Sequence, residues 1–297
     1  SETLSGDEIH NWLTVNGTSV GINEGKATEY VKKLAASYDT AYKAKSLKTS
    51  YGKTVSITGG SYGYKINQAK EAATLVSLIK NGEQISREPE YSQKGASRTG
   101  NDYGNTYVEI NLTAQHLYFY VKGKLVVQSD FVSGNAAKGW STPAGAYSIT
   151  YKQRNATLKG QGYATPVSYW MPFNGGIGLH DANWRKTFGG TIYKTNGSHG
   201  CVNLPPAVAK TIYENISAGD PVLCYHLDGT ESASTSGTKK DETAATTAAA
   251  TTAAPETTAA PTTAAPETTA TPTTAAPTTE APTTPAAGGD QESVGPG

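Results

Sequence analysis

Six consecutive residues, Ser198-His199-Gly200-Cys201-Val202-Asn203, have the types needed for acyl transfer. A cysteine reacts as its thiolate, and a free cysteine with a pKa near ~8.5 is only slightly ionised at neutral pH. A nearby imidazole or helix N-terminus corrects this, and His180 lies upstream in the sequence. Gly200 permits a tight turn, so the N–H groups of Gly200 and Cys201 could point together at an oxyanion. The segment predicts a nucleophilic cysteine with a histidine base.

The elements around this segment are expected to position it. Residues Pro205–Ile216 predict a helix whose opening prolines suit a first turn, since a missing N–H costs little there. Cys201 lies four residues before the first proline, which predicts that it sits near the positive end of the helix dipole. His180 ends a strand-like run, Gly176–His180, and is the imidazole that the fold would bring to Cys201.

The same half of the chain reads as mainly β. Short runs of β-type residues are separated by turn residues, and Lys122-Gly123 fits a two-residue hairpin turn. The predicted strands are Tyr107–Asn111, His116–Val121, Lys124–Ser129, Ala146–Tyr151 and Pro221–His226. We therefore predict a mainly β catalytic domain at 101–228.

The first hundred residues have a different pattern. Apolar residues at helical spacing predict helices at Gly25–Tyr38 and Asn67–Lys80, with an alternating strand at Thr54–Thr58 between them. The stretch Ser92–Asn105 is rich in Gly, Ser and Asn and is predicted to be a linker. These features predict a small α+β module at 1–100.

The C-terminal tail, 229–297, is dominated by Thr, Ala and Pro and is predicted to be disordered, because it has too few apolar residues to form a core. The formal net charge of the chain is zero, but the tail after Lys240 holds seven acidic residues and no basic one. The preceding 240 residues therefore carry a formal charge of +7. This suits an anionic polymer such as a bacterial cell wall, and equally an ordinary soluble surface.

The two cysteines do not imply a disulfide scaffold, although Cys201 and Cys224 could pair. Cys224 is expected in a core strand. Zinc bound by His180, His199 and Cys201 lacks a fourth ligand and a paired ligand motif, so no metal and no cofactor is expected. No run is long and apolar enough to span a membrane. Because the chain begins at Ser1, we expect a processed form whose membrane contact is limited to an anchor outside this sequence.

The motif SHGCVN, with 17 residues between His180 and Ser198, resembles the signature of L,D-transpeptidase catalytic domains. Two further stretches, Ser141–Ile149 and Tyr169–Asp181, also resemble this family, and the resemblance covers about 105–226. Residues Gly63–Gln93 look like the peptidoglycan-binding module found upstream of such domains in Gram-positive bacteria. The implied fold is a β-sandwich or barrel-like L,D-transpeptidase fold with one or two helices.

The resemblance implies a role for each matching residue. Cys201 would be the nucleophile and His180 the base, oriented by the backbone carbonyl of Asp181, while a role for the Asp181 carboxylate stays open. His199 would shape the anionic side of the site or be structural, and Gly200 would help to donate N–H groups. The implied substrate-binding residues are Tyr169, Ser198, Asn203, Trp184 and Arg185. For Arg185 and Lys186, contact with a D-Ala carboxylate competes with a solvated loop, which is favoured.

The implied reaction uses peptidoglycan stem peptides as donor and acceptor. Cys201 would attack the third residue of a tetrapeptide stem, release D-Ala and form a thioester, and a neighbouring stem amine would then form a 3→3 crosslink. Carbapenems are expected to acylate Cys201. Water as acceptor would give an L,D-carboxypeptidase, and a non-catalytic cell-wall-binding protein is the other alternative. A papain-like protease would have its cysteine far upstream of its histidine, unlike this chain. We expect an extracytoplasmic or secreted protein of a Gram-positive bacterium, with no nucleic-acid partner.

Overall fold

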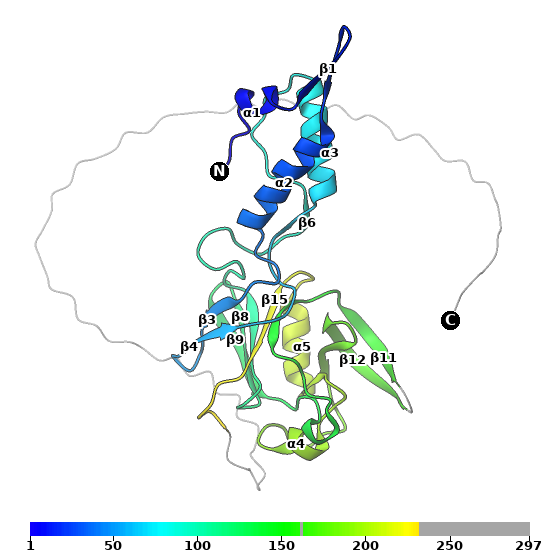
Figure 1. The fold of residues 1–297 in the computed structure, drawn as a ribbon. Helices are drawn as coiled ribbons and strands as arrows, with labels where there is room; N and C mark the ends of the chain where they lie inside the picture. The colour runs from blue at the N-terminus through cyan, green and yellow to red at the C-terminus, as the bar shows by residue number, and fades with distance from the viewer. Residues whose placement is uncertain (161–162, 232–297) are drawn as a thin grey trace, which may run out of the picture. The chain divides into compact units, whose positions relative to one another are not determined.

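The structure, a computed structural model, describes residues 1–160 and 163–231 (Figure 1). The predicted disordered tail therefore lies outside the described residues from 232 onward. The described residues all belong to one compact unit. Within them no helix is both long and apolar enough to cross a lipid bilayer.

Two helices dominate the N-terminal region, α2 (Glu24–Tyr38) and α3 (Gln68–Lys80), as the periodicity predicts. Each begins after an asparagine whose side chain accepts a backbone N–H: Asn23 from Lys26, and Asn67 from Lys70. Small and branched residues form the contact between the helices, and Trp12 closes one end of it. The remaining elements of this region are α1 (Gly6–His10), the hairpin of β1 (Leu13–Asn16) and β2 (Ser19–Ile22), and the pair of β5 (Lys65–Ile66) and β6 (Tyr91–Gln93).

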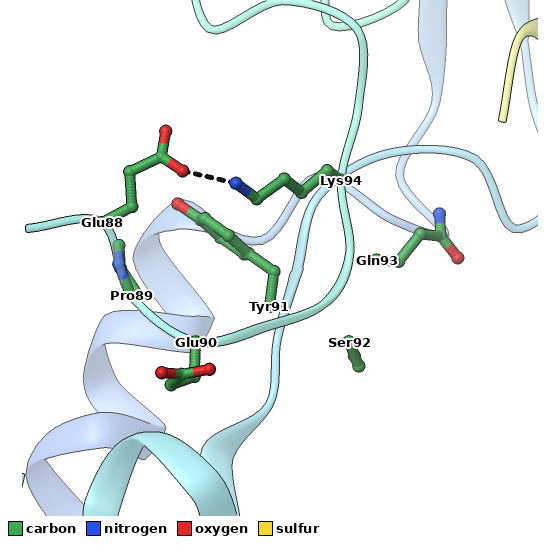
Figure 2. Close-up of a pocket in the computed structure, with 7 residues that line it drawn as sticks. All are labelled: Glu88, Pro89, Glu90, Tyr91, Ser92, Gln93 and Lys94. Carbon is green, nitrogen blue, oxygen red and sulfur yellow. Dashed lines mark hydrogen bonds and ion pairs between the residues drawn. The ribbon is translucent and has the colours of Figure 1, made fainter. Parts of the chain in front are cut away.

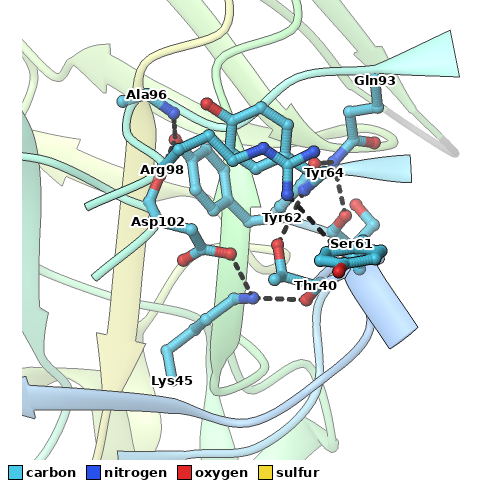
Figure 3. Close-up of polar contacts among 11 residues, drawn as sticks. Thr40, Lys45, Ser61, Tyr62, Tyr64, Gln93, Ala96, Arg98 and Asp102 are labelled. Carbon is cyan, nitrogen blue, oxygen red and sulfur yellow. Dashed lines mark hydrogen bonds and ion pairs between the residues drawn. The ribbon is translucent and has the colours of Figure 1, made fainter. Parts of the chain in front are cut away.

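A second hairpin, β3 (Lys45–Lys48) with β4 (Thr54–Ile57), confirms the predicted strand near residue 54. Its buried residues Leu47 and Ile57 pack with Leu223 and Tyr225, so the hairpin covers part of the catalytic region. Figure 3 shows the polar contacts beside this junction, where the Lys45 ammonium lies 2.7 Å from the Asp102 carboxylate. Both side chains are about nine-tenths buried, with exposed fractions of 5% and 10%. The pair therefore ties β3 to the segment that leads into the strand at Tyr107.

The catalytic region contains two sheets, as expected for a mainly β domain. The first has the order β10-β15-β7-β8-β9, with β7 (Tyr107–Asn111), β8 (His116–Val121), β9 (Lys124–Asp130), β10 (Gly145–Ser148) and β15 (Pro221–Tyr225). The second has the order β11-β12-β13-β14, with β11 (Gln153–Gly160), β12 (Tyr163–Asn174), β13 (Ile177–Asp181) and β14 (Val202–Leu204). The long β11–β12 ladder was not predicted from the sequence. The predicted Lys122-Gly123 turn is confirmed, since both residues have positive φ and Val121 pairs with Lys124.

One hydrophobic core joins the two sheets and helix α5 (Pro206–Asn215). Val108 and Val222 come from the first sheet, Leu179 and Val202 from the second, and Ile212 from α5, and all five are fully buried. Figure 1 shows α5 alongside β12, and their packing is confirmed by contacts with β12 and β13. The helix thus supports the inner face of the second sheet and leaves its other face for a site.

Two short helical elements complete the region. A 3-10 turn at Ala136–Lys138 follows β9. Helix α4 (Ile192–Asn196) lies between β13 and β14 in the sequence, and the loop Gly197–Gly200 connects it to Cys201. These loops lie at the ends of the strands that carry the motif residues.

Candidate active site

His180 lies in β13, and Cys201 directly precedes β14, the neighbouring strand of the second sheet. β13 and β14 run parallel, with Leu179 opposite Val202 and His180 opposite Asn203. Leu179 and Val202 both face the core, so alternation turns the side chains of His180 and Asn203 to the other face. Cys201 precedes Asn203 by two residues and shares that face. The structure therefore brings the predicted nucleophile and base to one side of one sheet.

A shared neighbour, Trp170, marks the same place. Trp170 in β12 pairs with His180, and the two rings lie 6.0 Å apart between centroids. Cys201 packs against the small cluster of Trp170, Ala156 and Val167, which belongs to the β11–β12 hairpin. Trp170 was not predicted as a site residue. It lies beside the imidazole and belongs to the apolar cluster against which Cys201 packs.

The imidazole of His180 has a fixed tautomer. Its Nδ1 lies 2.9 Å from the backbone carbonyl oxygen of Asp181, which can only accept, so Nδ1 carries the proton. This leaves Nε2 with a lone pair. His180 is buried, and burial lowers its pKa, so the imidazole is neutral and ready to accept a proton.

Asp181 has a second contact through its carboxylate. One carboxylate oxygen accepts the backbone N–H groups of Ser168 and Tyr169, each at 2.8 Å. The carbonyl of Asp181 thus orients His180, as the family resemblance implies, while the buried carboxylate holds β12 against the end of β13.

The thiol of Cys201 is half-buried and is not bonded to Cys224. Burial raises the pKa of the Cys201 thiol to about 11, with a backbone hydrogen bond from Gly178 opposing the rise. The thiol lies 3.5 Å from the carbonyl oxygen of Gly176. In the free protein the Cys201 thiol is therefore protonated and the His180 imidazole is neutral.

The prediction that Cys201 lies near the positive end of a helix dipole is wrong. Strand β14 separates Cys201 from Pro206, the first residue of α5. An extended chain rises about 3.3 Å per residue, so the cysteine lies several residues of extended chain from the helix, beyond the first-turn range of the dipole.

The turn before Cys201 is held by hydroxyl groups. Ser198 Oγ donates to the Cys201 carbonyl at 2.6 Å and accepts the Gly200 N–H at 3.0 Å. Thr142 Oγ1 donates to the Gly200 carbonyl at 2.6 Å and accepts the Gly134 N–H at 3.0 Å. Gly200 has φ of 124°, a backbone conformation that favours glycine, and a Cβ there would press on the Ile177 side chain at 3.1 Å.

These contacts bear on two sequence predictions, for Gly200 and for Ser198. The Gly200 N–H is used by Ser198, so it does not serve as an oxyanion donor in this structure, which leaves the Cys201 N–H as the candidate donor. Ser198 was predicted to bind substrate, and in the structure its hydroxyl shapes the turn, with its single proton given to the Cys201 carbonyl and one acceptor position used by the Gly200 N–H. The sequence showed the hydroxyls but not which backbone groups they would meet.

Tyr169 is also corrected. It was expected to line the donor pocket, but it is adjacent to Trp170 in the strand and therefore faces the other way. Its ring packs on Tyr213 of α5, 5.4 Å away, and under the Arg154 guanidinium at 4.6 Å. The residue that faces the thiol is Trp170.

The other predicted residues border the site. Trp184 is exposed, and its ring lies 6.0 Å from that of His180. His199 is exposed and stacks on Trp140, with centroids 4.2 Å apart. Asn203 is buried beside His180, and its Oδ1 has no hydrogen-bond partner within the described chain. Arg185 follows in the turn after β13. Trp140 was not predicted, although it directly precedes a motif noted in the sequence.

Two other features do not contribute to the site. Cys224 is fully buried in the core, as predicted. The surface hollow in Figure 2 is formed by Glu88–Lys94 in the N-terminal region and contains neither cysteine nor histidine. Glu88 and Lys94 form an ion pair beside it. It is therefore no candidate for thiol chemistry.

Fold and site together define a mainly β domain that presents a cysteine and a buried histidine on one sheet face. A family model for the L,D-transpeptidase catalytic domain matches residues 105–224. A second model, described as "Putative peptidoglycan binding domain", matches residues 5–87. No curated protein sequence matches the chain.

Solved structures extend this similarity to most of the chain. The crystal structure of a cysteine-to-serine mutant of the Enterococcus faecium L,D-transpeptidase is 34% identical, with coverage of 75% of this chain and 90% of that one and a TM-score of 0.61. Its avibactam carbamoyl form gives the same identity and TM-score, with coverage of 75% and 88%. The NMR structure of the E. faecium catalytic domain is 42% identical, with coverage of 41% and 97% and a TM-score of 0.38. The chain belongs to the L,D-transpeptidase family and is a peptidoglycan-acting enzyme with a cell-wall-associated, extracytoplasmic location.

Proposed function

We propose that Cys201 is the nucleophile of this L,D-transpeptidase and that His180 is its general base. The observation that carries the proposal is the common sheet face of the two side chains, with the His180 tautomer fixed by the Asp181 carbonyl. The thiol pKa near 11 and the lowered imidazole pKa indicate a neutral pair before substrate binds. Proton transfer and attack then occur together.

The first half of the reaction acylates the enzyme. Cys201 Sγ attacks the main-chain carbonyl carbon of the third stem residue, whose centre is L, while its proton passes to His180 Nε2. The Cys201 N–H faces the developing oxyanion. The tetrahedral intermediate collapses with cleavage of the C–N bond, and His180 returns the proton to the departing D-Ala amine. The product is a thioester on Cys201.

The second half transfers the acyl group. The side-chain amine of a diamino acid in a neighbouring stem attacks the thioester and loses a proton to His180. The C–S bond breaks, the thiolate recovers the proton, and a 3→3 crosslink forms. Water in place of the amine would yield the trimmed stem, the L,D-carboxypeptidase alternative.

The remaining site residues border the donor path. His199, stacked on Trp140, and Trp184, beside His180, form its two exposed sides. Asn203 would offer its unpaired Oδ1 to a donor on the substrate. The N-terminal region is proposed to hold peptidoglycan, on the strength of the family match at 5–87. We place the protein outside the membrane of a Gram-positive bacterium. Its proposed parts are the α+β module at 1–100, the catalytic domain at 101–228 and the tail at 229–297.

Mass spectrometry of the purified chain tests the nucleophile. With a stem tetrapeptide, we expect D-Ala release, a thioester adduct on the Cys201 peptide and crosslinked dimers. A carbapenem should add its mass to the same peptide, in line with the carbamoyl enzyme known for the E. faecium relative. Cys201→Ala should abolish both adducts, whereas Cys224→Ala, which removes only the buried core thiol, should retain them.

The outcomes separate the alternatives. A thioester followed only by trimmed stems identifies a carboxypeptidase. If the folded protein binds peptidoglycan but forms no adduct on Cys201, it is a wall-binding protein.

A further inference from the structure

Arg185 carries a polar atom that the described protein leaves unsatisfied. Its backbone N–H donates to the Ala182 carbonyl at 3.0 Å, which places the side chain in the turn directly after β13. The Nε atom is buried and has no hydrogen-bond partner within the described residues. No ion pair to Arg185 occurs there either. The Arg185 side chain as a whole is only half-buried, so the rest of the guanidinium can still meet a ligand, and a buried polar atom without a partner is uncommon in folded proteins.

Arg185 also lines a surface pocket next to the proposed active site. Its lining residues contribute two cations and no acid, and they are Trp184, Arg185, Lys186, Thr187, Ile192 and Asn196. Burial lowers the pKa of Arg185, as expected for a cation held partly out of water without a counter-ion. The pocket is therefore built for an anion.

Two observations place the pocket beside His180. The Trp184 ring, which lines the pocket, lies 6.0 Å from the imidazole. The positive charge of Arg185 also contributes to lowering the pKa of His180, so the two groups interact electrostatically. An anion in this pocket would lie on the His180 side of the reacting centre.

We propose that the Arg185 pocket binds the α-carboxylate of the D-Ala that leaves the donor stem. This rests on the proposed function, in which His180 protonates the departing amine, so the leaving residue must lie against His180. The carboxylate of D-Ala is separated from that amine by a single Cα. A guanidinium close to His180 would therefore lie near this carboxylate. Planar guanidinium groups bind carboxylates through two parallel hydrogen bonds.

This assignment would give the tetrapeptide donor, which the family resemblance already implies, a physical basis in this chain. A tetrapeptide stem ends in a carboxylate one residue beyond the scissile bond, whereas a pentapeptide stem has a neutral amide at that position.

The test compares two donors in each of three enzymes. The donors are the stem tetrapeptide with a free C-terminal carboxylate and the same peptide with a C-terminal carboxamide. The enzymes are the unmodified chain, Arg185→Gln and Lys194→Gln, the last removing an exposed cation from α4 that does not line the pocket. The readout is the ratio of kcat/KM for thioester formation with acid over amide.

The unmodified chain and Lys194→Gln should prefer the acid by roughly 10–100-fold, the range expected for a charged hydrogen-bonded pair. Arg185→Gln should bring the ratio close to one. Arg185→Lys, which keeps the charge but loses the planar fork, should be intermediate. Because the ratio is taken within one preparation, partial misfolding of a variant cancels.

An acid preference that survives unchanged in Arg185→Gln would overturn the proposal. Failure of the proposed function is distinct, because then neither donor would acylate Cys201 in any variant. Alkylation of Cys201 by iodoacetamide reports an intact site in both cases.

Discussion

The backbone carbonyl of Asp181 accepts the Nδ1 proton of His180 at 2.9 Å, and the carboxylate of the same residue accepts two N–H groups of β12. One residue thereby fixes the imidazole and the strand that carries Trp170. The carbonyl contact does not depend on the Asp181 side chain, whereas the strand contact does.

Substitution of Asp181 separates these two contacts. Asp181→Asn keeps an oxygen for the Ser168 and Tyr169 amides and should retain most of its kcat. Asp181→Ala leaves two buried amides without an acceptor and should lower the free energy of unfolding by roughly 2–4 kcal/mol. Urea unfolding and D-Ala release measure the two effects. If Asp181→Asn is as stable as the parent yet nearly inactive, the carboxylate charge itself takes part in catalysis.

Thr142 should be needed for its hydroxyl. The Oγ1 atom bonds both the Gly200 carbonyl and the Gly134 N–H, and Thr142 is buried. Thr142→Val keeps the side-chain shape but leaves both backbone groups without a hydrogen-bond partner. We therefore expect the free energy of unfolding to fall by about 2–4 kcal/mol and acylation to be slower. Thr142→Ser keeps the hydroxyl and serves as the matched control. Equal acylation rates in the two variants would show that the Gly200 turn holds without this clamp.

The reactivity of the free enzyme should depend on pH in a defined direction. A thiol pKa raised to about 11 means that thiolate is scarce at neutral pH and grows tenfold per pH unit. The rate of iodoacetamide alkylation at Cys201 should therefore climb steadily from neutral pH and level off only near pH 11. A plateau that begins near neutral pH would instead indicate a preformed thiolate–imidazolium pair.

With a stem peptide as substrate, the pH dependence of kcat/KM should follow the protonation of His180. The base must be unprotonated, and burial lowers its pKa below the usual 6.5, so kcat/KM should be flat at neutral pH and fall only in more acidic solution. A fall that begins well above pH 6.5 would contradict the buried, neutral imidazole.

Local sequence patterns predicted much of the fold because the elements concerned are encoded locally. The helices Glu24–Tyr38 and Gln68–Lys80 have apolar residues at helical spacing and asparagine caps, and the strand Tyr107–Asn111 has valine and isoleucine at alternate positions. The strand Gln153–Gly160 does not: most of its residues are polar and exposed, so nothing in it distinguishes a strand from a loop. Its pairing with β12 defines it, and a partner strand is not visible in a local pattern.

The site shows the same limit. The motif around Cys201 and the upstream His180 were visible in the sequence, and the parallel pairing of β13 with β14 brings them to one face. Which neighbour in Tyr169-Trp170 faces the thiol depends on strand register, and a shift of one residue exchanges the two sides. The use of the Gly200 N–H was likewise decided by the folded position of the Ser198 hydroxyl.

That register can be tested by comparing the two aromatic residues. Trp170 packs against Cys201 and pairs with His180, so Trp170→Ala should reduce kcat/KM for acylation by more than tenfold, since it removes the ring beside which the thiol and imidazole are positioned. Tyr169→Ala removes packing on Tyr213 and should mainly lower stability, by about 2–4 kcal/mol. Tyr169→Phe, which keeps the ring, should behave like the parent in both assays. Thermal unfolding measures the stability of each variant, and the rate of thioester formation measures its acylation. A catalytic loss in Tyr169→Phe with normal acylation by Trp170→Ala would reverse the assignment and place Tyr169 at the donor site.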